Sequence, residues 1–152
     1  MWGGMTRKSN SRSSVISLLG KFTSPRRICY PEIMVIQLRQ DRDLEQLLEK
    51  SKTNPVLIFK HSTQCSISGQ AYDEFREFAE SAGELICGVV SVIEDRAVSD
   101  SIAERLSVRH ETPQVIVIKN GRATWHASHW SITIDSLIAA LRPYGQPVDQ
   151  RN

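Results

Sequence analysis

The chain has 152 residues, of which 40% are hydrophobic and 24% are charged, a composition typical of one soluble globular domain. No stretch approaches the ~20 consecutive apolar residues that a membrane-spanning helix needs, which argues against a membrane protein. The net charge of +2 is unevenly distributed along the chain. Residues 1–33 hold six basic residues and one acidic residue, a net charge of +5, which leaves a net charge of −3 on the remainder. A mildly acidic folded part gives no electrostatic basis for binding nucleic acid.

Residues 1–33 are set apart by their composition. Residues 1–27 are rich in serine and arginine and contain no acidic residue. Three interpretations stay open for residues 1–33: a disordered leader, a transit-like targeting segment, or a start assigned too early, since Met34 directly precedes the first patterned segment. We expect one folded domain over residues 34–145 and a flexible tail over residues 146–152.

The domain consists of short apolar runs that alternate with segments of helical spacing. The runs predict strands over residues 34–38, 56–59, 85–93, 114–119 and 122–128. The helical segments are 41–51, 66–82, 97–106 and a last one within 133–145. We expect Asp41 to cap the first helix. Asn120-Gly121, between the last two runs, predicts a type I′ hairpin turn.

The order of these segments predicts an α/β fold. Alternating strands and helices imply a sheet with a parallel core, and the terminal hairpin adds an antiparallel edge to this mixed sheet. Helices on both faces of the sheet complete a three-layer α/β/α sandwich.

The cysteines indicate a redox role. Cys29, Cys65 and Cys87 cannot all pair with one another, which argues against a disulfide-stapled secreted domain and favours a reducing compartment. Cys65 directly precedes a predicted helix, whose dipole and unpaired N–H groups favour a thiolate. We therefore expect the pKa of Cys65 to lie below the ~8.5 of a free cysteine. Lys60 and His61 are candidates to add positive potential there.

The residue three positions after Cys65 determines which chemistry is open to the thiolate. A dithiol oxidoreductase carries a second cysteine there, but this motif reads Cys65-Ser66-Ile67-Ser68. Without a second thiol in the motif, a mixed disulfide on Cys65 waits for an outside thiol. Cys87 lies inside an apolar run, which favours a buried structural role over a resolving one.

Two stretches, VLIFKHSTQCSIS and VIEDRAVSDSIAERLSVRHETPQVIVIKNG, resemble the monothiol bacilliredoxin family, the redox-active proteins of the bacillithiol system. The family belongs to the thioredoxin-fold superfamily, and the resemblance covers about residues 36–142. The combination of KHST, Cys-x-Ile-Ser and HETPQ with IKNG is specific, whereas Cys-x-x-Ser alone is weak. Gln64 and Ser66 stand where the family's motif often has threonine and proline.

The resemblance implies a cytoplasmic thiol–disulfide oxidoreductase that removes bacillithiol from S-bacillithiolated proteins. Cys65 is then the catalytic nucleophile, and it holds the bacillithiol until a low-molecular-weight thiol or a partner protein resolves the adduct. Bacillithiol acts as a cosubstrate, and no bound cofactor or metal is implied. In a thioredoxin-like topology the Thr112-Pro113 bond is cis and faces the cysteine. The residues expected to contact substrate are Thr63, Gln64, Ser66, Ile67, Ser68, Thr112 and Pro113.

Two alternative functions stay open. A glutathione-linked monothiol glutaredoxin that carries an iron–sulfur cluster reads Cys-Gly-Phe-Ser, which Ser66 and Ile67 do not match. The second alternative is a non-catalytic thioredoxin-fold binding module, in which Cys65 would have the pKa of an ordinary thiol.

The sequence gives weaker indications of function for the histidines and tryptophans outside these motifs. His126 and His129 form a His-x-x-His pair, but the sequence offers no further ligands for a metal, so surface or packing positions are expected. Trp125 and Trp130 are also interpreted as packing residues. The roles of His61 and His110, which flank the two site segments, stay open.

Overall fold

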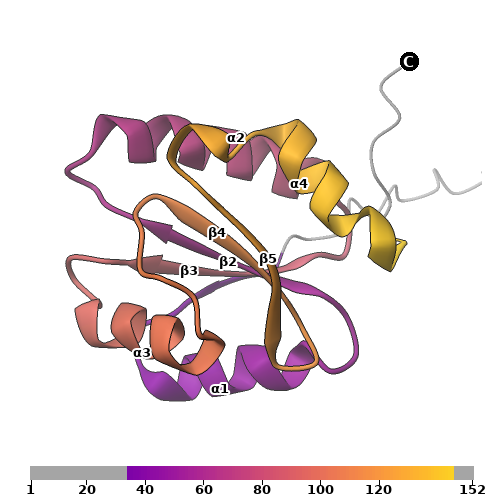
Figure 1. The fold of residues 1–152 in the computed structure, drawn as a ribbon, viewed down its shortest axis with the longest axis horizontal. Helices are drawn as coiled ribbons and strands as arrows, with labels where there is room; N and C mark the ends of the chain where they lie inside the picture. The colour runs from indigo at the N-terminus through magenta and orange to yellow at the C-terminus, as the bar shows by residue number, and fades with distance from the viewer. Residues whose placement is uncertain (1–33, 146–152) are drawn as a thin grey trace, which may run out of the picture.

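The computed structural model describes residues 34–145 (Figure 1). The interpretations of residues 1–33 as a leader, a targeting segment or a misassigned start, and of residues 146–152 as a tail, lie outside the described residues. In the described range, no helix is long and apolar enough to cross a membrane.

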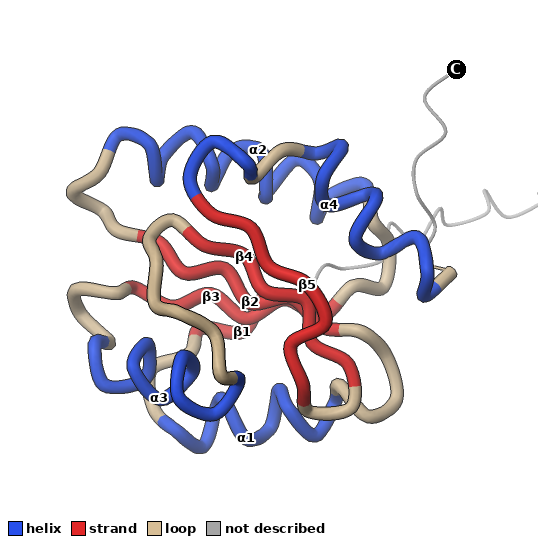
Figure 2. Tube along the Cα trace, in the orientation of Figure 1, coloured by secondary structure: helices blue, strands red, loops and turns tan. Residues whose placement is uncertain are grey.

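A five-stranded mixed sheet forms the centre of the fold (Figure 2). Its strands are β1 (Met34–Gln37), β2 (Val56–His61), β3 (Ile86–Ser91), β4 (Gln114–Lys119) and β5 (Arg122–Ser128). Their order across the sheet is β1-β3-β2-β4-β5. β1 and β2 both pair parallel with β3, β4 is antiparallel to β2, and β5 is antiparallel to β4. The predicted parallel core with a terminal antiparallel hairpin is confirmed.

Helices cover both faces of the sheet (Figure 1). One face carries α2 (Ser66–Ser81) and α4 (Ile134–Leu141), and the other carries α1 (Asp41–Lys50) and α3 (Arg96–Leu106). Two short 3-10 helices, η1 (His129–Ser131) and η2 (Arg142–Tyr144), precede and follow α4. The predicted three-layer α/β/α sandwich is confirmed.

β2 separates two hydrophobic cores, because its side chains alternate between the faces of the sheet. Leu57 and Phe59 join the core beneath α2 and α4, where Phe59 stacks on Phe75 with ring centroids 4.8 Å apart. Ile58 joins the core beneath α1 and α3. Each such buried side chain contributes about 1.5–3 kcal/mol. Burial on both faces explains why the sequence of this strand is a continuous apolar run.

The turn residues behave as predicted at the hairpin but not at α1. Asn120 and Gly121 have φ of 52° and 72°, and a type I′ turn requires positive φ at both positions. The expectation that Asp41 caps α1 is wrong, because Asp41 is already the first helical residue. Gln40 is the N-cap, and its backbone N–H donates to the Asp43 carboxylate at 3.2 Å, as part of a capping box.

Candidate active site

The two predicted site segments emerge at the same edge of the sheet. β2 and β4 are antiparallel neighbours, with Lys60 opposite Gln114. β2 therefore ends where β4 begins. The turn after β2 carries Cys65, and the loop before β4 carries Thr112 and Pro113, so the sheet brings the cysteine turn and the Thr-Pro loop to one end of the molecule.

Cys65 is the N-cap residue of α2. Its backbone is extended, with φ −118° and ψ 122°, and its carbonyl accepts the Gly69 N–H at 3.3 Å. The side chain makes no capping hydrogen bond and is partly exposed. The sulfur thus belongs to the residue at which the unpaired N–H groups of the first helical turn begin, and this position favours an anion.

Ser68 occupies the position of the second cysteine in dithiol motifs. Its side chain is 1% exposed, and its hydroxyl accepts a hydrogen bond from the backbone N–H of Ser62 at 3.1 Å. This bond fastens the turn before Cys65 to the first turn of α2. Burial leaves the Ser68 hydroxyl little access to a substrate.

The remaining neighbours of Cys65 are accessible. Thr63, Gln64 and Ser66 are exposed, and Ile67 is partly exposed. Gln64 is also held by its backbone N–H, which donates to the Ser62 hydroxyl at 3.3 Å. Their contact with substrate stays a prediction.

Cys87 lies apart from this site. It is fully buried in β3, within the core beneath α2 and α4, and burial raises the pKa of its thiol to about 12. Cys65 and Cys87 are the free cysteines of the described residues, and Cys29 lies outside them. Cys87 therefore has the environment of the structural residue that its apolar run predicts.

The Thr112-Pro113 peptide bond is cis, as the thioredoxin-like topology implies. Pro113 is buried, and its carbonyl accepts the His129 N–H at 3.0 Å. The Thr112 hydroxyl is buried and has no hydrogen-bond partner among residues 34–145. These contacts fix Pro113 to the start of η1, while the Thr112 hydroxyl is left unpaired.

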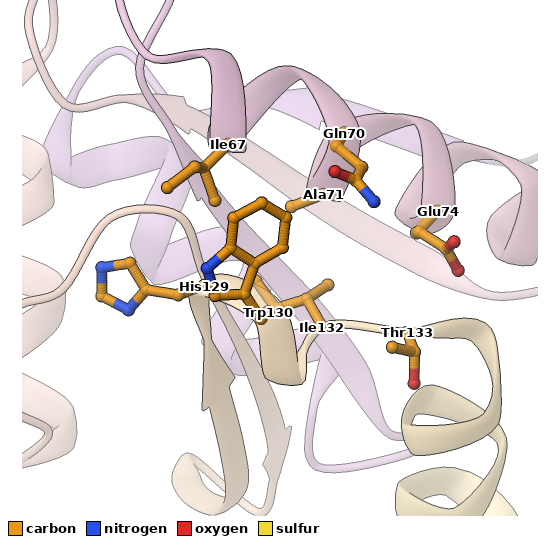
Figure 3. A pocket seen from close by; sticks show the side chains of 8 residues that line it. All are labelled: Ile67, Gln70, Ala71, Glu74, His129, Trp130, Ile132 and Thr133. Carbon is orange, nitrogen blue, oxygen red and sulfur yellow. The ribbon is translucent and has the colours of Figure 1, made fainter.

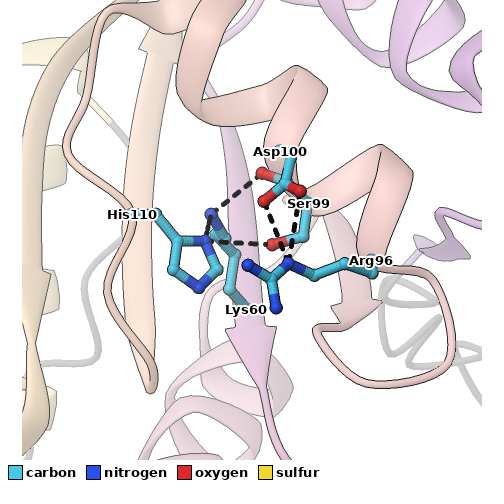
Figure 4. A network of polar contacts seen from close by, with 5 residues as sticks. All are labelled: Lys60, Arg96, Ser99, Asp100 and His110. Atoms are coloured by element: carbon cyan, nitrogen blue, oxygen red, sulfur yellow. Dashed lines mark hydrogen bonds and ion pairs between the residues drawn. The ribbon is translucent and has the colours of Figure 1, made fainter.

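Lys60, a candidate to add positive potential at Cys65, has its ammonium bound at Ser99 and His110 instead. Strand alternation directs Lys60 to the opposite face of the sheet from α2, where it lies under α3 (Figure 4). Burial lowers the pKa of Lys60 to about 8. The next residue, His61, points to the α2 side.

His61 closes an aromatic stack on the α2 side of the sheet. Its ring lies 5.9 Å from that of Phe59 and 5.7 Å from that of Tyr72, measured between ring centroids. Burial lowers the pKa of His61, and the Glu94 carboxylate opposes this shift. His61 also borders a depression of about 350 Å³ at the carboxyl ends of the three parallel strands. The depression is lined by Gln37, Arg39, His61, Ser91, Glu94 and Asp95.

A second, smaller cavity lies beside the first turns of α2 (Figure 3). Its volume is about 50 Å³, and it is lined by Ile67, Gln70, Ala71, Glu74, His129, Trp130, Ile132 and Thr133. Trp130 faces Ile67 across this cavity, yet its side chain is 66% exposed. η1 therefore forms a wall of this cavity. His129 is exposed, in agreement with the expected surface or packing position, whereas the interpretation of Trp130 as a packing residue missed its place in the wall.

The hairpin register contains a signal that could have placed η1. Counting outward from Asn120-Gly121 pairs Gln114 with Ala127 and so sets the end of β5 beside the start of β4. The structure pairs Gln114 with Ser128, one residue later, because the register shifts at Val117/Ile118. The residues after Ser128 must then lie beside the Thr-Pro segment. Among residues 34–145, no group of three or more His, Cys, Asp and Glu side chains is arranged to hold a metal ion.

Comparison with known proteins agrees with this geometry. Residues 36–137 match the family model described as "Monothiol bacilliredoxin BrxC". A solved structure of a proposed oxidoreductase with a thioredoxin fold is 34% identical, with a TM-score of 0.65, over 70% of this chain and 93% of that one.

Two thioredoxins are more distant matches. Fasciola hepatica thioredoxin is 18% identical (TM-score 0.59, 72% of this chain and 98% of that one), and reduced Schistosoma mansoni thioredoxin pre-protein is 25% identical (TM-score 0.58, 73% and 98%). The predicted thioredoxin-like fold is confirmed, and family and fold together support a thiol–disulfide redox function. The chain belongs to the monothiol bacilliredoxin family.

Proposed function

We propose that this protein removes bacillithiol from S-bacillithiolated proteins by a monothiol mechanism. The observation that carries the proposal is one partly exposed cysteine, Cys65, at the start of α2, with Ser68 in place of a second thiol. Membership of the bacilliredoxin family supports bacillithiol as the transferred thiol. The proposed setting is the cytoplasm, whose thiols are kept reduced.

The first step transfers bacillithiol from the target to the protein. The Cys65 thiolate attacks the bacillithiol sulfur of the target's mixed disulfide. The original S–S bond breaks, and a new S–S bond joins Cys65 to bacillithiol. The target cysteine leaves as a thiolate and takes up a proton from water. One disulfide replaces another, so the step consumes no oxidant or reductant.

The second step restores Cys65 with an outside thiol. In this proposal a second bacillithiol, as its thiolate, attacks the bacillithiol sulfur held on Cys65, which gives bacillithiol disulfide and the free Cys65 thiolate. Ser68 has no sulfur and cannot compete for this step. The Cys65 adduct therefore lasts until an outside thiol arrives.

The loop before β4 orients the target in this proposal. An extended segment of the target pairs with the backbone of Thr112, beside the cis proline, and so presents its disulfide to Cys65. The accessible residues around the nucleophile, Thr63, Gln64, Ser66 and Ile67, supply the remaining contacts. This arrangement explains why both segments lie at one edge of the sheet.

Mass spectrometry of the purified protein with an S-bacillithiolated peptide tests the mechanism. We expect a bacillithiol adduct on Cys65 and one freed peptide thiol for each adduct formed. Cys65→Ser should show neither product, whereas Cys87→Ala, which removes the buried thiol, should show both. Transfer at the wild-type rate in Cys65→Ser would overturn the mechanism. Equally fast transfer from a glutathionylated peptide would favour the glutathione-linked alternative.

A further inference from the structure

Lys60 is a fully buried cation that forms no ion pair among residues 34–145, although the nearby Asp100 carboxylate partly offsets the lowering of its pKa by burial. Its ammonium donates to the Ser99 carbonyl of α3 at 3.1 Å and contacts Nδ1 of His110 at 2.9 Å (Figure 4). None of the ion pairs among residues 34–145 involves Lys60. The Asp100 carboxylate of α3 is bound by Arg96 instead. Burying an unpaired charge is unfavourable, so the two contacts of this ammonium deserve a functional explanation.

Below pH 8, where Lys60 is an ammonium, its contact with His110 has one chemical form. Because an ammonium only donates, Nδ1 of His110 must accept, and only a neutral imidazole with its proton on Nε2 has a lone pair there. The Ser99 hydroxyl lies 3.4 Å from the same nitrogen. Lys60 thus holds the His110 ring in one orientation and one tautomer.

This contact joins the two halves of the active site. Lys60 lies in β2, five residues before Cys65, and His110 lies two residues before Thr112. A second tie runs alongside, because Gln114, which is directly opposite Lys60 in β4, donates from Nε2 to the Arg109 carbonyl at 2.9 Å. The loop before Thr112 is therefore bound to the face of the sheet that α1 and α3 cover.

We infer that Lys60 is a positioning residue, which acts through His110 to hold the Thr112–Pro113 segment in register with the Cys65 turn. The inference rests on the proposed function, in which this segment orients the mixed disulfide. An apolar side chain at position 60 would avoid the unfavourable burial of charge, but it could not donate to His110. The ammonium provides the loop contact that a hydrophobic core residue cannot.

The same contact makes the position of the loop sensitive to acid. A proton on His110 Nδ1 removes the acceptor and places two cations 2.9 Å apart. Burial, then the Lys60 charge, then Arg96 lower the pKa of His110, while Asp100 opposes them, and Gln114 on β4 is neutral. The contact is thus intact at neutral pH and breaks as the pH falls below the ordinary histidine value of 6.5.

Four variants test the inference: Lys60→Met, His110→Ala, His110→Asn and the exposed control Lys50→Met. Amide hydrogen exchange of His129, whose N–H donates to the Pro113 carbonyl at 3.0 Å, reports the position of the loop without any substrate. The alkylation rate of Cys65 by iodoacetamide reports the thiol alone, and the KM and kcat of transfer from an S-bacillithiolated peptide report orientation. If Lys60→Met does not fold, His110→Ala, which removes the same contact and leaves β2 unchanged, carries the test.

We expect Lys60→Met and His110→Ala to lose exchange protection at the His129 amide and to raise the KM by roughly tenfold, the scale of one lost hydrogen bond to a charged group. Alkylation of Cys65 should not change. His110→Asn offers a carbonyl oxygen near the place of Nδ1 and cannot be protonated, so it should keep the wild-type KM and lose the acid limb of the pH profile. Lys50→Met should match the wild type throughout.

Two results would overturn the inference: wild-type exchange protection in Lys60→Met, or a Cys65 alkylation rate that falls in step with transfer. If the wild-type protein frees no thiol from the bacillithiolated peptide, the proposed function fails. The exchange measurement still decides the role of Lys60 in that case, because it uses no substrate.

Discussion

The backbone N–H of Ser62 donates a hydrogen bond to the Ser68 hydroxyl at 3.1 Å, across the turn that carries Cys65. Ser68 therefore has two consequences for the site. It removes the thiol that would resolve a mixed disulfide from within, and it braces the turn in front of the nucleophile. The lifetime of the adduct and the rigidity of the turn can be tested separately at position 68.

Ser68→Cys should change the mechanism from monothiol to dithiol. The introduced sulfur lies in the first turn of α2, from which it can attack the Cys65 sulfur of the mixed disulfide and expel bacillithiol. Intact-mass spectrometry should then show an internal disulfide in place of the bacillithiol adduct. An adduct of unchanged lifetime would mean that the introduced sulfur does not reach Cys65.

Ser68→Ala is the matched control for the brace. It leaves the partly buried Ser62 N–H without its acceptor, and the loss of one such hydrogen bond costs about 0.5–1.5 kcal/mol. Urea denaturation should show a loss of this size in the free energy of unfolding, whereas the lifetime of the Cys65 adduct should not shorten. Unchanged stability would contradict the bracing role of the hydroxyl.

The two described cysteines should differ sharply in reactivity. Iodoacetamide at neutral pH should label Cys65 in the folded protein and leave Cys87 unlabelled, because Cys87 is fully buried and burial raises the pKa of its thiol to about 12. Peptide mapping distinguishes the sites, and urea should expose Cys87 to the reagent. Comparable labelling of both in the native state would contradict the buried position of Cys87.

Lys60 should give stability a distinctive dependence on alkaline pH. Burial lowers the pKa of Lys60 from 10.5 to about 8, so above pH 8 the unfolded chain binds more protons than the folded protein. The contribution of Lys60 to the free energy of unfolding therefore rises between about pH 8 and pH 10.5, and its full penalty applies below pH 8.

Urea denaturation of the wild type and Lys60→Met at pH 7, 8 and 9 isolates this effect, because the two proteins differ only at position 60. The stability of the wild type relative to the variant should increase with pH. A difference that stays constant from pH 7 to pH 9 would show that Lys60 is not desolvated in the folded state.

Local patterns were sufficient to predict the sheet, the helices and the position of Cys65 at the start of α2. Apolar runs, helical spacing and Asn120-Gly121 are each local, and the order of the elements restricts the topology. The prediction ended β2 at Phe59, two residues early, because Lys60 and His61 are polar. The ammonium of buried Lys60 contacts Ser99 and His110, which lie 39 and 50 residues away along the chain. No local sequence pattern therefore contains its partners.

The wall formed by η1 was missed for a similar reason. His129 has a φ of 53°, a left-handed conformation that its residue type alone does not predict. A register shift in the hairpin at Val117/Ile118 also changes which residues of β5 pair with β4. Trp130 follows β5 in a segment without a clear helical or strand pattern, so it was interpreted as a packing residue. Its place opposite Ile67 depends on how η1 lies against α2 in the folded protein.

The His61 ring should make the protein less stable in acid. Burial lowers the pKa of His61 from 6.5, so below that value the unfolded chain binds more protons than the folded protein, and stability falls as the pH falls. His61→Phe keeps a ring between Phe59 and Tyr72 and cannot be protonated. Its stability relative to the wild type should therefore be greater at pH 5 than at pH 7.5 in urea denaturation.

His61→Leu separates titration from stacking. It should show the same gain relative to the wild type on going from pH 7.5 to pH 5, but from a lower starting stability, because it loses the aromatic contacts with Phe59 and Tyr72. His110 is present in all three proteins and cancels in the comparison. If the stability of His61→Phe relative to the wild type were the same at both pH values, the ring of His61 would be as free to take up a proton in the folded protein as in the unfolded chain.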